Sequence, residues 1–199
     1  MTGFVYKKNP LDQARTPRAR EWRKKTEGLS FGCTTKGKKE GTNQKKFMVA
    51  ISYNKGVVMC KEFDFRLNGY KFARMVRRDF PLAFSLSNNP KAKRILQDGC
   101  PVQNSKRATR AIGRLGGHLF CIPARSPDVN PIENFFHLVG KELKQRALDR
   151  KITSETEEEF VARVQKTMEF PVEPINKTIE SMDKQIDLII KNGGQRTEY

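Results

Sequence analysis

Two runs of mostly apolar residues follow the first 46 positions of the chain and have the composition of β-strands. FMVAISY at residues 47–53 and VVMCKEFDF at 57–65 are rich in β-branched and aromatic residues, and the turn sequence NKG separates them. This pattern predicts a β-hairpin. Residues 1–46 show no sustained apolar periodicity and are rich in Lys, Arg, Gly and Thr, so we expect them to form a mostly irregular basic arm.

The next segment has the spacing of an amphipathic helix. Its apolar stripe consists of Tyr70, Phe72, Ala73, Val76 and Phe80. Asn68 fits the N-cap, and Pro81 marks the predicted end because proline lacks the N–H that a helix interior needs. We therefore expect one helix to cover a face of the sheet.

A strand, a helix and a second strand are predicted between residues 93 and 124. KRILQDG at 93–99 and HLFCIPA at 118–124 are short apolar runs. Between them, NSKRATRAIGRLGG reads as a helix capped by Asn104 or Ser105 and ended by its two final glycines. A βαβ unit with a parallel strand pair is the expected result.

The last third of the chain is predicted to be helical, over residues 131–148, 154–168 and 173–192. Alternating strands and helices after a hairpin indicate an α/β domain with a mixed sheet. We divide the chain into the basic arm at 1–46, a core at 47–150, and carboxy-terminal helices at 151–199 that pack on the core.

The net charge of +17 comes from 39 Lys and Arg against 22 Asp and Glu. It is +9 for residues 1–46, +9 for 47–140 and −1 for 141–199. A basic surface on the first two of these segments favours a nucleic acid as the partner, although a merely solubilising surface is an alternative.

Four cysteines without a CxxC pair, and only two histidines, do not match zinc-site spacing. The sequence contains no signal peptide and no apolar run of membrane-spanning length, so neither secretion nor a membrane is indicated. We expect reduced thiols in a cytosolic or nuclear protein.

Two carboxylates are candidates for chemistry. Asn130, Pro131 and Glu133 fit the N-cap, N1 and N3 positions of a helix, so the Glu133 side chain could simply reach back to the cap backbone N–H. Asp98 lies at the carboxyl end of a predicted strand, where it could form a turn or belong to a site. If both meet at one edge of the sheet, a hard cation such as Mg²⁺ or Mn²⁺ would relieve their repulsion.

The motif LQDG with Asp98, followed downstream by ARSPDVNPIENFFHLVGKELK with Glu133, resembles the catalytic core of DDE transposases of the Tc-one/mariner superfamily. The separation of the two acids is that of the family's second and third acids, SPDVNPIEN is the most specific part, and EWRKKTEGL and FMVAISYNKGVV are also similar to that family. The resemblance implies an RNase-H-like fold in which three acids hold two divalent ions for DNA cleavage and strand transfer. Asp98 would be the second acid and Glu133 the third, and both would bind Mg²⁺ or Mn²⁺.

The chain departs from this family at its start. The first acid of the family lies upstream of the region matching FVYKKNP, where this chain offers only Thr2. Asp12 or Asp64 could replace it only if the fold brought them to the same edge. The helix-turn-helix DNA-binding region of the family is also missing, so we do not expect recognition of specific transposon ends.

Basic residues around a single tryptophan form a candidate DNA-binding segment. The residues are Arg15, Arg18, Arg20, Trp22, Arg23, Lys24 and Lys25. They could bind phosphates and stack on a base, or Trp22 could instead pack on the core. RTPRAREWRKK also resembles a nuclear-targeting cluster, so we expect the protein in the nucleus.

Our leading hypothesis is a transposase-derived DDE domain that binds DNA and has impaired catalysis. The alternative is a non-catalytic DNA-binding or protein-interaction module of the same origin. DNA is the expected partner in the leading hypothesis, and formation of a homodimer is left open.

Overall fold

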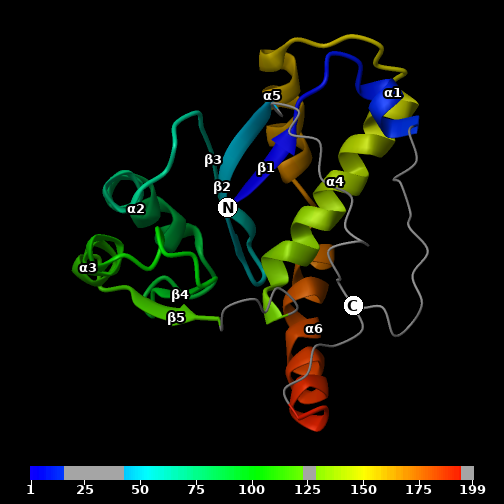
Figure 1. Ribbon diagram of the computed structural model, residues 1–199. Coiled ribbons are helices and arrows are strands. Elements are labelled where there is room, and N and C mark those ends of the chain that lie inside the picture. The colour runs from blue at the N-terminus through cyan, green and yellow to red at the C-terminus, as the bar shows by residue number, and fades with distance from the viewer. Residues whose placement is uncertain (16–42, 123–128, 194–199) are drawn as a thin grey trace, which may run out of the picture.

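The computed structural model describes residues 1–15, 43–122 and 129–193, where the chain forms strands and helices in alternation (Figure 1). The strands are β1 (Thr2–Val5), β2 (Gln44–Ser52), β3 (Gly56–Phe63), β4 (Arg94–Gln97) and β5 (His118–Cys121). The helices are α1 (Pro10–Arg15), α2 (Gly69–Leu86), α3 (Lys106–Arg114), α4 (Pro131–Asp149), α5 (Glu157–Met168) and α6 (Val172–Lys191). The predicted α/β class is confirmed. Within these ranges, no helix is both long enough and apolar enough to cross a bilayer.

The predicted hairpin is formed by β2 and β3. They pair antiparallel up to Ser52 and Gly56, with an irregularity in register between Ala50 and Ile51. Asn54 and Gly56 have φ angles of 58° and 73°, and Asn and Gly are the residues that tolerate this left-handed conformation.

β1 extends this sheet on the other side of β2, in the order β1-β2-β3. It pairs antiparallel with residues 44–47 of β2 only, with Thr2 opposite Phe47. Within the described residues, β2 has no strand neighbour on that side from Met48 onward.

The predicted βαβ unit is confirmed, because β4 and β5 pair in parallel and α3 connects them. Ser105 is the N-cap of α3 and accepts a hydrogen bond from the Ala108 N–H, while Gly116 follows the helix with φ 73°. These two strands form a sheet of their own. The expected single mixed sheet is therefore divided into an antiparallel and a parallel part.

Helix α2 continues to Leu86, so the prediction that it ends at Pro81 was wrong. Pro81 is exposed, whereas Phe80, Ala83 and Phe84 on the inner face are buried. An interior proline costs about 3 kcal/mol. Burial of the residues that follow it, at about 1.5–3 kcal/mol for a phenylalanine side chain, offsets that cost.

Two hydrophobic clusters lie on opposite faces of the β1-β2-β3 sheet, with α2 and α3 on one side and α4, α5 and α6 on the other (Figure 1). Alternation along β2 explains the division. Met48 belongs to the cluster with α2 and α3, whereas Phe47 and Val49 belong to the cluster with Phe135 of α4.

The helical last third is confirmed, with start positions set by its caps. Asn130 caps α4 and Pro131 occupies its first turn. Helix α5 begins at Glu157 rather than near 154, because Thr156 and Glu159 form a reciprocal capping box.

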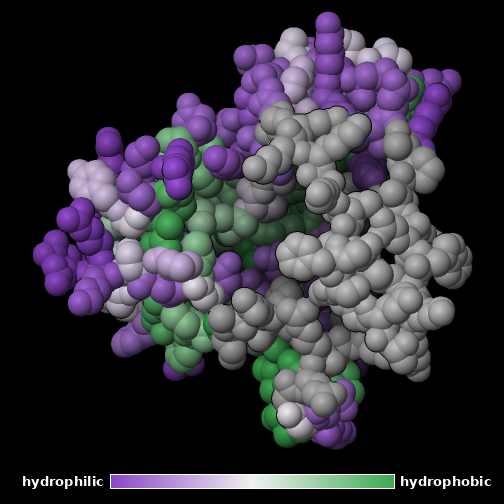
Figure 2. Space-filling view, in the orientation of Figure 1, coloured by the Kyte–Doolittle hydropathy of each residue, from purple (hydrophilic) through white to green (hydrophobic). Residues whose placement is uncertain are grey.

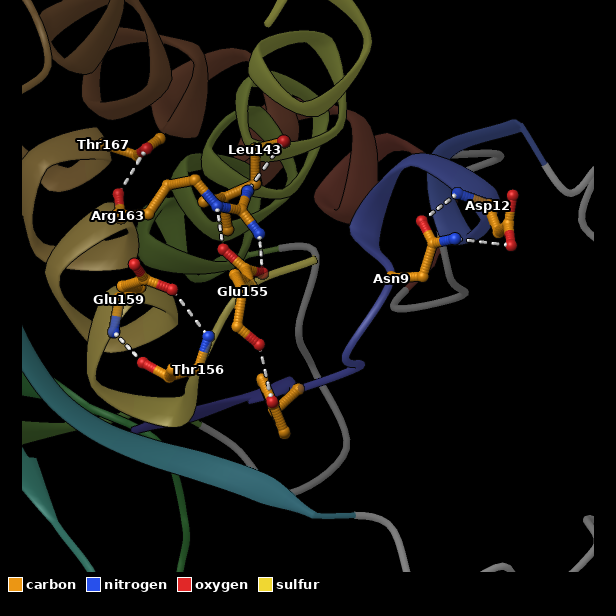
Figure 3. Close-up of polar contacts among 9 residues, drawn as sticks. Asn9, Asp12, Leu143, Glu155, Thr156, Glu159, Arg163 and Thr167 are labelled. Atoms are coloured by element: carbon orange, nitrogen blue, oxygen red, sulfur yellow. Dashed lines mark hydrogen bonds and ion pairs between the residues drawn. The ribbon is translucent and has the colours of Figure 1, made fainter. Parts of the chain in front are cut away.

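Part of the predicted irregular arm is regular, since residues 2–5 form β1 and residues 10–15 form α1. Backbone hydrogen bonds join this segment to the α4–α5 connection, from Leu11 N–H to the Ile152 carbonyl and from Glu155 N–H to the Lys8 carbonyl. The Glu155 carboxylate is bound in turn by the Arg163 guanidinium of α5 (Figure 3). Residues 16–42 of the arm lie outside the described residues.

Candidate functional site

A cavity of about 350 Å³ lies between β2, β4 and the start of α4. Its apolar wall comes from β2, β3 and α2 and includes Met48 and Phe84. Its polar wall includes Asp98, Gln103, Asn130 and Glu133. The two carboxylates that the sequence singles out therefore line the same cavity, although they are far apart in the chain.

Asp98 follows the last residue of β4 and is exposed. Its Oδ1 accepts a hydrogen bond of 3.2 Å from the Cys100 N–H, so the turn-forming role considered for it is present. In the described residues, its Oδ2 has no hydrogen-bond or ion-pair partner. One carboxylate oxygen shapes the loop, and the other is available to a ligand.

Glu133 is the third residue of α4 and is exposed. The cap is made by Asn130, whose Oδ1 accepts from the Ile132 N–H at 3.4 Å and whose carbonyl accepts from the Glu133 N–H at 3.0 Å. The expected bond from the cap N–H back to the Glu133 side chain is not formed. Among the described residues this carboxylate has no polar partner, so capping does not account for its orientation.

Asn104 ties together the loop that carries Asp98. Its Nδ2 donates to the Asp98 carbonyl at 2.7 Å and to the Cys100 carbonyl at 3.0 Å. Its Oδ1 accepts from Gln97 Nε2 at 3.0 Å and from Cys121 Sγ at 2.9 Å. The ends of β4 and β5 are thus joined through one amide, which makes the position of Asp98 dependent on Asn104.

Gln103 is the unexpected member of the site. Its side chain is only 5% exposed, and its Oε1 is buried without a hydrogen-bond partner. A buried acceptor without a partner is unfavourable unless something else binds it. Sequence reasoning missed Gln103, because its buried oxygen is evident only in the folded chain.

Other acids do not complete the site in the described part of the chain. The cavity is lined by Met1 but not by Thr2, Asp12 or Asp64. The Asp12 carboxylate, in α1, accepts a hydrogen bond from the side chain of Asn9, which precedes that helix (Figure 3). No group of three His, Cys, Asp or Glu side chains in residues 1–15, 43–122 and 129–193 is arranged to hold a metal ion.

The predicted DNA-binding segment is mostly outside the described residues. Arg15 is exposed at the end of α1, which packs beside α4. Arg18, Arg20, Trp22, Arg23, Lys24 and Lys25 lie in the range 16–42. Their role in binding DNA stays a prediction.

No protein-family model matches the chain, and no curated protein matches it in sequence. In structure it is similar to the Mos1 transposase paired-end complex with the left transposon end, with a TM-score of 0.66 at 12% identity over 92% of this chain and 52% of that chain. The Mos1 mariner paired-end complex with Mn gives 0.66 at 15% identity, over 92% and 52%. The catalytic domain of Mos1 mariner transposase gives 0.61 at 12% identity, over 77% and 82%.

The chain spans about half the length of the transposase chains in those paired-end complexes. At this level of identity the similarity establishes the fold. The protein has the RNase-H-like fold of a transposase catalytic domain.

Proposed function

We propose that the chain is a transposase-derived, DDE-type domain that binds DNA, and that its ancestral role in metal-dependent DNA cleavage and strand transfer is impaired. The observation that carries this proposal is the shared cavity of Asp98 and Glu133. A fold similar to that of the Mos1 catalytic domain supports it.

The donor atoms of the cavity suit a hard divalent cation in kind. Asp98 and Glu133 offer carboxylate oxygens, which are ligands that Mg²⁺ and Mn²⁺ prefer. A cation would also reduce the repulsion between the two carboxylates. When bound, it would supply Lewis-acid activation of a water or hydroxyl oxygen for attack on a phosphodiester.

The residues of this chain would contribute positioning as well as charge. Asn104 fixes the backbone of Asp98 through its hydrogen bond to the carbonyl, and the Asn130 cap fixes the first turn that carries Glu133. Catalysis depends on such fixed geometry, because misplacement of a reacting group by about 1 Å can cost a hundredfold in rate.

The described residues that line the cavity include Met1 but no acid besides Asp98 and Glu133, and this lack of a third acid is the reason for proposing impaired catalysis. Met1 lines the cavity together with the two acids, and its side chain packs against the cluster around α2. A thioether is a soft, neutral group that does not replace a carboxylate as a ligand for Mg²⁺. We therefore expect weak cation binding and slow turnover.

A non-catalytic DNA-binding or protein-interaction module is the second candidate. The apolar Met1 in the wall of the cavity favours it over an active nuclease. In that case DNA binding would persist in EDTA and fall steeply with salt, because counterion release does not need a divalent cation.

A plasmid-nicking assay with Mn²⁺ or Mg²⁺ tests the proposal. The variants are Asp98→Ala, Glu133→Ala, and Met1→Asp behind an amino-terminal tag, with Asp64→Ala as the control for loss of an exposed acid away from the cavity. We expect little nicking by the unmodified chain, a gain of at least tenfold in Met1→Asp, and loss of that gain when Asp98 or Glu133 is also replaced.

Calorimetric titration with Mn²⁺ provides a second readout that does not depend on turnover. Affinity should fall in Asp98→Ala and Glu133→Ala, rise in Met1→Asp, and stay the same in Asp64→Ala. Robust nicking by the unmodified chain that Asp98→Ala abolishes would disprove the impairment. Equal Mn²⁺ affinity in all variants would disprove the metal site itself.

A further inference from the structure

Positive charge is concentrated in the part of the fold that contains α2, α3, β4 and β5. Residues 66–122 hold twelve Lys and Arg against two acids, Asp79 and Asp98. On the opposite side of the β1-β2-β3 sheet, residues 157–191 of the α5–α6 region hold five Lys and Arg against eight acids. The field of the protein is therefore strongly asymmetric, and its positive side is the outer surface of α2 and α3.

Helices α2 and α3 run side by side in the same direction. At their starts, a Cβ on Gly69 would lie 2.5 Å from the Ser105 Oγ. At their ends, a Cβ on Gly117, just after α3, would lie 3.3 Å from the Phe84 ring. Exposed side chains on the two helices therefore form neighbouring rows.

Five exposed arginines define these rows, which we call the α2–α3 basic surface: Arg74, Arg77, Arg107, Arg110 and Arg114. The spacing of the last three, at i, i+3 and i+7, places them on one side of α3. The Arg107 guanidinium lies 5.9 Å from the centre of the exposed Tyr70 ring of α2, which brings the two rows together at their starts. Figure 2 shows hydrophilic residues gathered over α3, at the left of the view.

The charges on this surface are not balanced within the described part of the chain. The neighbouring Arg78 pairs with Asp79, but none of the five arginines of the α2–α3 basic surface forms an ion pair there. Arg110 and Arg114 are like charges one turn apart, which repel each other.

The start of α3 is also unfavourable in charge. It begins with Lys106 and Arg107 and has no acid in its first turn, although the dipole makes this end of a helix positive. Helix α5 shows the favourable arrangement, with three glutamates in its first turn. A polyanion bound along α3 would relieve the repulsion that the free protein carries.

We propose that the α2–α3 basic surface binds the phosphate backbone of duplex DNA. This inference rests on the proposed function in assuming that DNA is the polyanion. Arg107 to Arg114 cover two turns of helix, or about 10 Å, and about three phosphates of each DNA strand lie within that length of the duplex axis. None of the five arginines lines the cavity of Asp98 and Glu133, so the surface is separate from that cavity.

The test compares two charge-matched triple variants of the full chain. Arg74→Gln/Arg110→Gln/Arg114→Gln removes three exposed charges that form no hydrogen bond, ion pair or cation–π contact in the described residues. Lys166→Gln/Lys184→Gln/Lys191→Gln removes three exposed charges from α5 and α6. Affinity for a short fluorescent duplex is measured by anisotropy in EDTA at several KCl concentrations, and thermal denaturation confirms that both variants fold.

We expect the arginine variant to bind at least tenfold more weakly at low salt. Its slope of log affinity against log salt should fall by about 2 to 3, since each lost phosphate contact removes about 0.9. The lysine variant should keep the affinity and slope of the unmodified chain within about threefold.

Two other results overturn the inference in different ways. If the unmodified chain and the arginine variant bind the duplex equally well, the DNA contacts lie elsewhere, for example in residues 15–25. The proposed function would then stay intact. Absence of DNA binding by the unmodified chain would overturn this inference and the DNA-binding part of the proposed function together.

Discussion

The Asn104 side chain donates a hydrogen bond of 2.7 Å to the Asp98 carbonyl, and this bond fixes the loop at the end of β4. The same amide donates to the Cys100 carbonyl and accepts from Gln97. An amide is needed for this combination, because a carboxylate cannot donate and an apolar side chain can do neither.

Asn104→Asp should therefore destabilise the protein more than Asn104→Ala. The alanine variant loses the bonds at a cost of about 1–3 kcal/mol, whereas the aspartate also places an anionic oxygen against two carbonyl oxygens. Urea denaturation measures both values. Asn88→Asp, at an exposed position, is the control for an added negative charge and should have little effect. Equal stability of Asn104→Asp and the unmodified chain would contradict the network.

Gly69 and Gly113 should respond in opposite ways to substitution by alanine. At Gly69 the new Cβ would lie 2.5 Å from Ser105 Oγ and 2.9 Å from Ser105 Cβ, so α2 and α3 must shift, at a cost of about 1–3 kcal/mol. At Gly113, inside α3, no atom lies within 4 Å of the new Cβ, and alanine should stabilise the helix by about 1 kcal/mol. Thermal denaturation of the two variants checks the signs, and a stabilised Gly69→Ala would show that the helix starts are less tightly packed.

Removing one partner of the buried ion pair between Arg163 and Glu155 should lower the free energy of unfolding more than removing both partners together. The two side chains are 11% and 4% exposed, and Arg163 also donates to the Leu143 carbonyl (Figure 3). Arg163→Met should cost about 3–5 kcal/mol because it leaves a buried carboxylate without its partner.

The double variant Arg163→Met/Glu155→Leu should recover part of that loss, since it buries neither charge. A double-mutant cycle by urea denaturation measures the coupling. Additive single effects would show that the two groups act independently.

Glu157 should give the stability a small dependence on pH. Its pKa is lowered below the ordinary 4.5 by hydrogen bonds from Lys45 and Asn43, and the pKa of Lys45 is raised above 10.5 chiefly by the bond to Glu157. A lowered carboxyl pKa stabilises the fold above pH 4.5, and that contribution is lost as the pH falls through the folded value. The raised Lys45 pKa stabilises the fold below pH 10.5, and its contribution is lost as the pH rises through the folded value.

The stability difference between the unmodified chain and Glu157→Gln should therefore be largest from about pH 5 to about pH 10 and shrink on both sides. Glu158→Gln removes an acid from the same first turn of α5 and is the matched control. A difference that does not change with pH would contradict the ion pair.

Cys60 should be the slowest to react of the cysteines at 60, 100 and 121. Burial raises the pKa of its thiol to about 11, so only about one thiol in a thousand is a reactive thiolate at pH 8. Cys121 is exposed. Iodoacetamide labelling followed by mass spectrometry of a Cys33→Ser variant should show Cys121 modified first, and equal rates would show that Cys60 is accessible.

The regular elements were predictable because their signals are local. The NKG turn, the Ser105 cap and the Asn130–Pro131 start each rely on residues a few positions apart, and the structure contains all three. The helix past Pro81 was not predictable in the same way, because burial of Phe84 against other elements outweighs the local signal of proline.

The candidate site shows the same limit. Asp98 and Glu133 could be selected from their positions at element ends and from a family resemblance. Gln103 and Asn104 could not, since their significance lies in a buried oxygen without a partner and in a network between two strands. Such relationships exist only once distant segments are packed together.

The hydrogen bonds between distant residues also constrain the order in which the chain can fold while it is synthesised on the ribosome. Tyr6 donates to the Glu155 carbonyl, a partner 149 positions later. At about 5–20 residues per second, synthesis of that partner takes roughly 7–30 s. β1 can pair with residues 44–47 of β2 long before that, so the attachment of the amino-terminal segment to the α4–α5 connection is a separate and later event in the maturation of the domain.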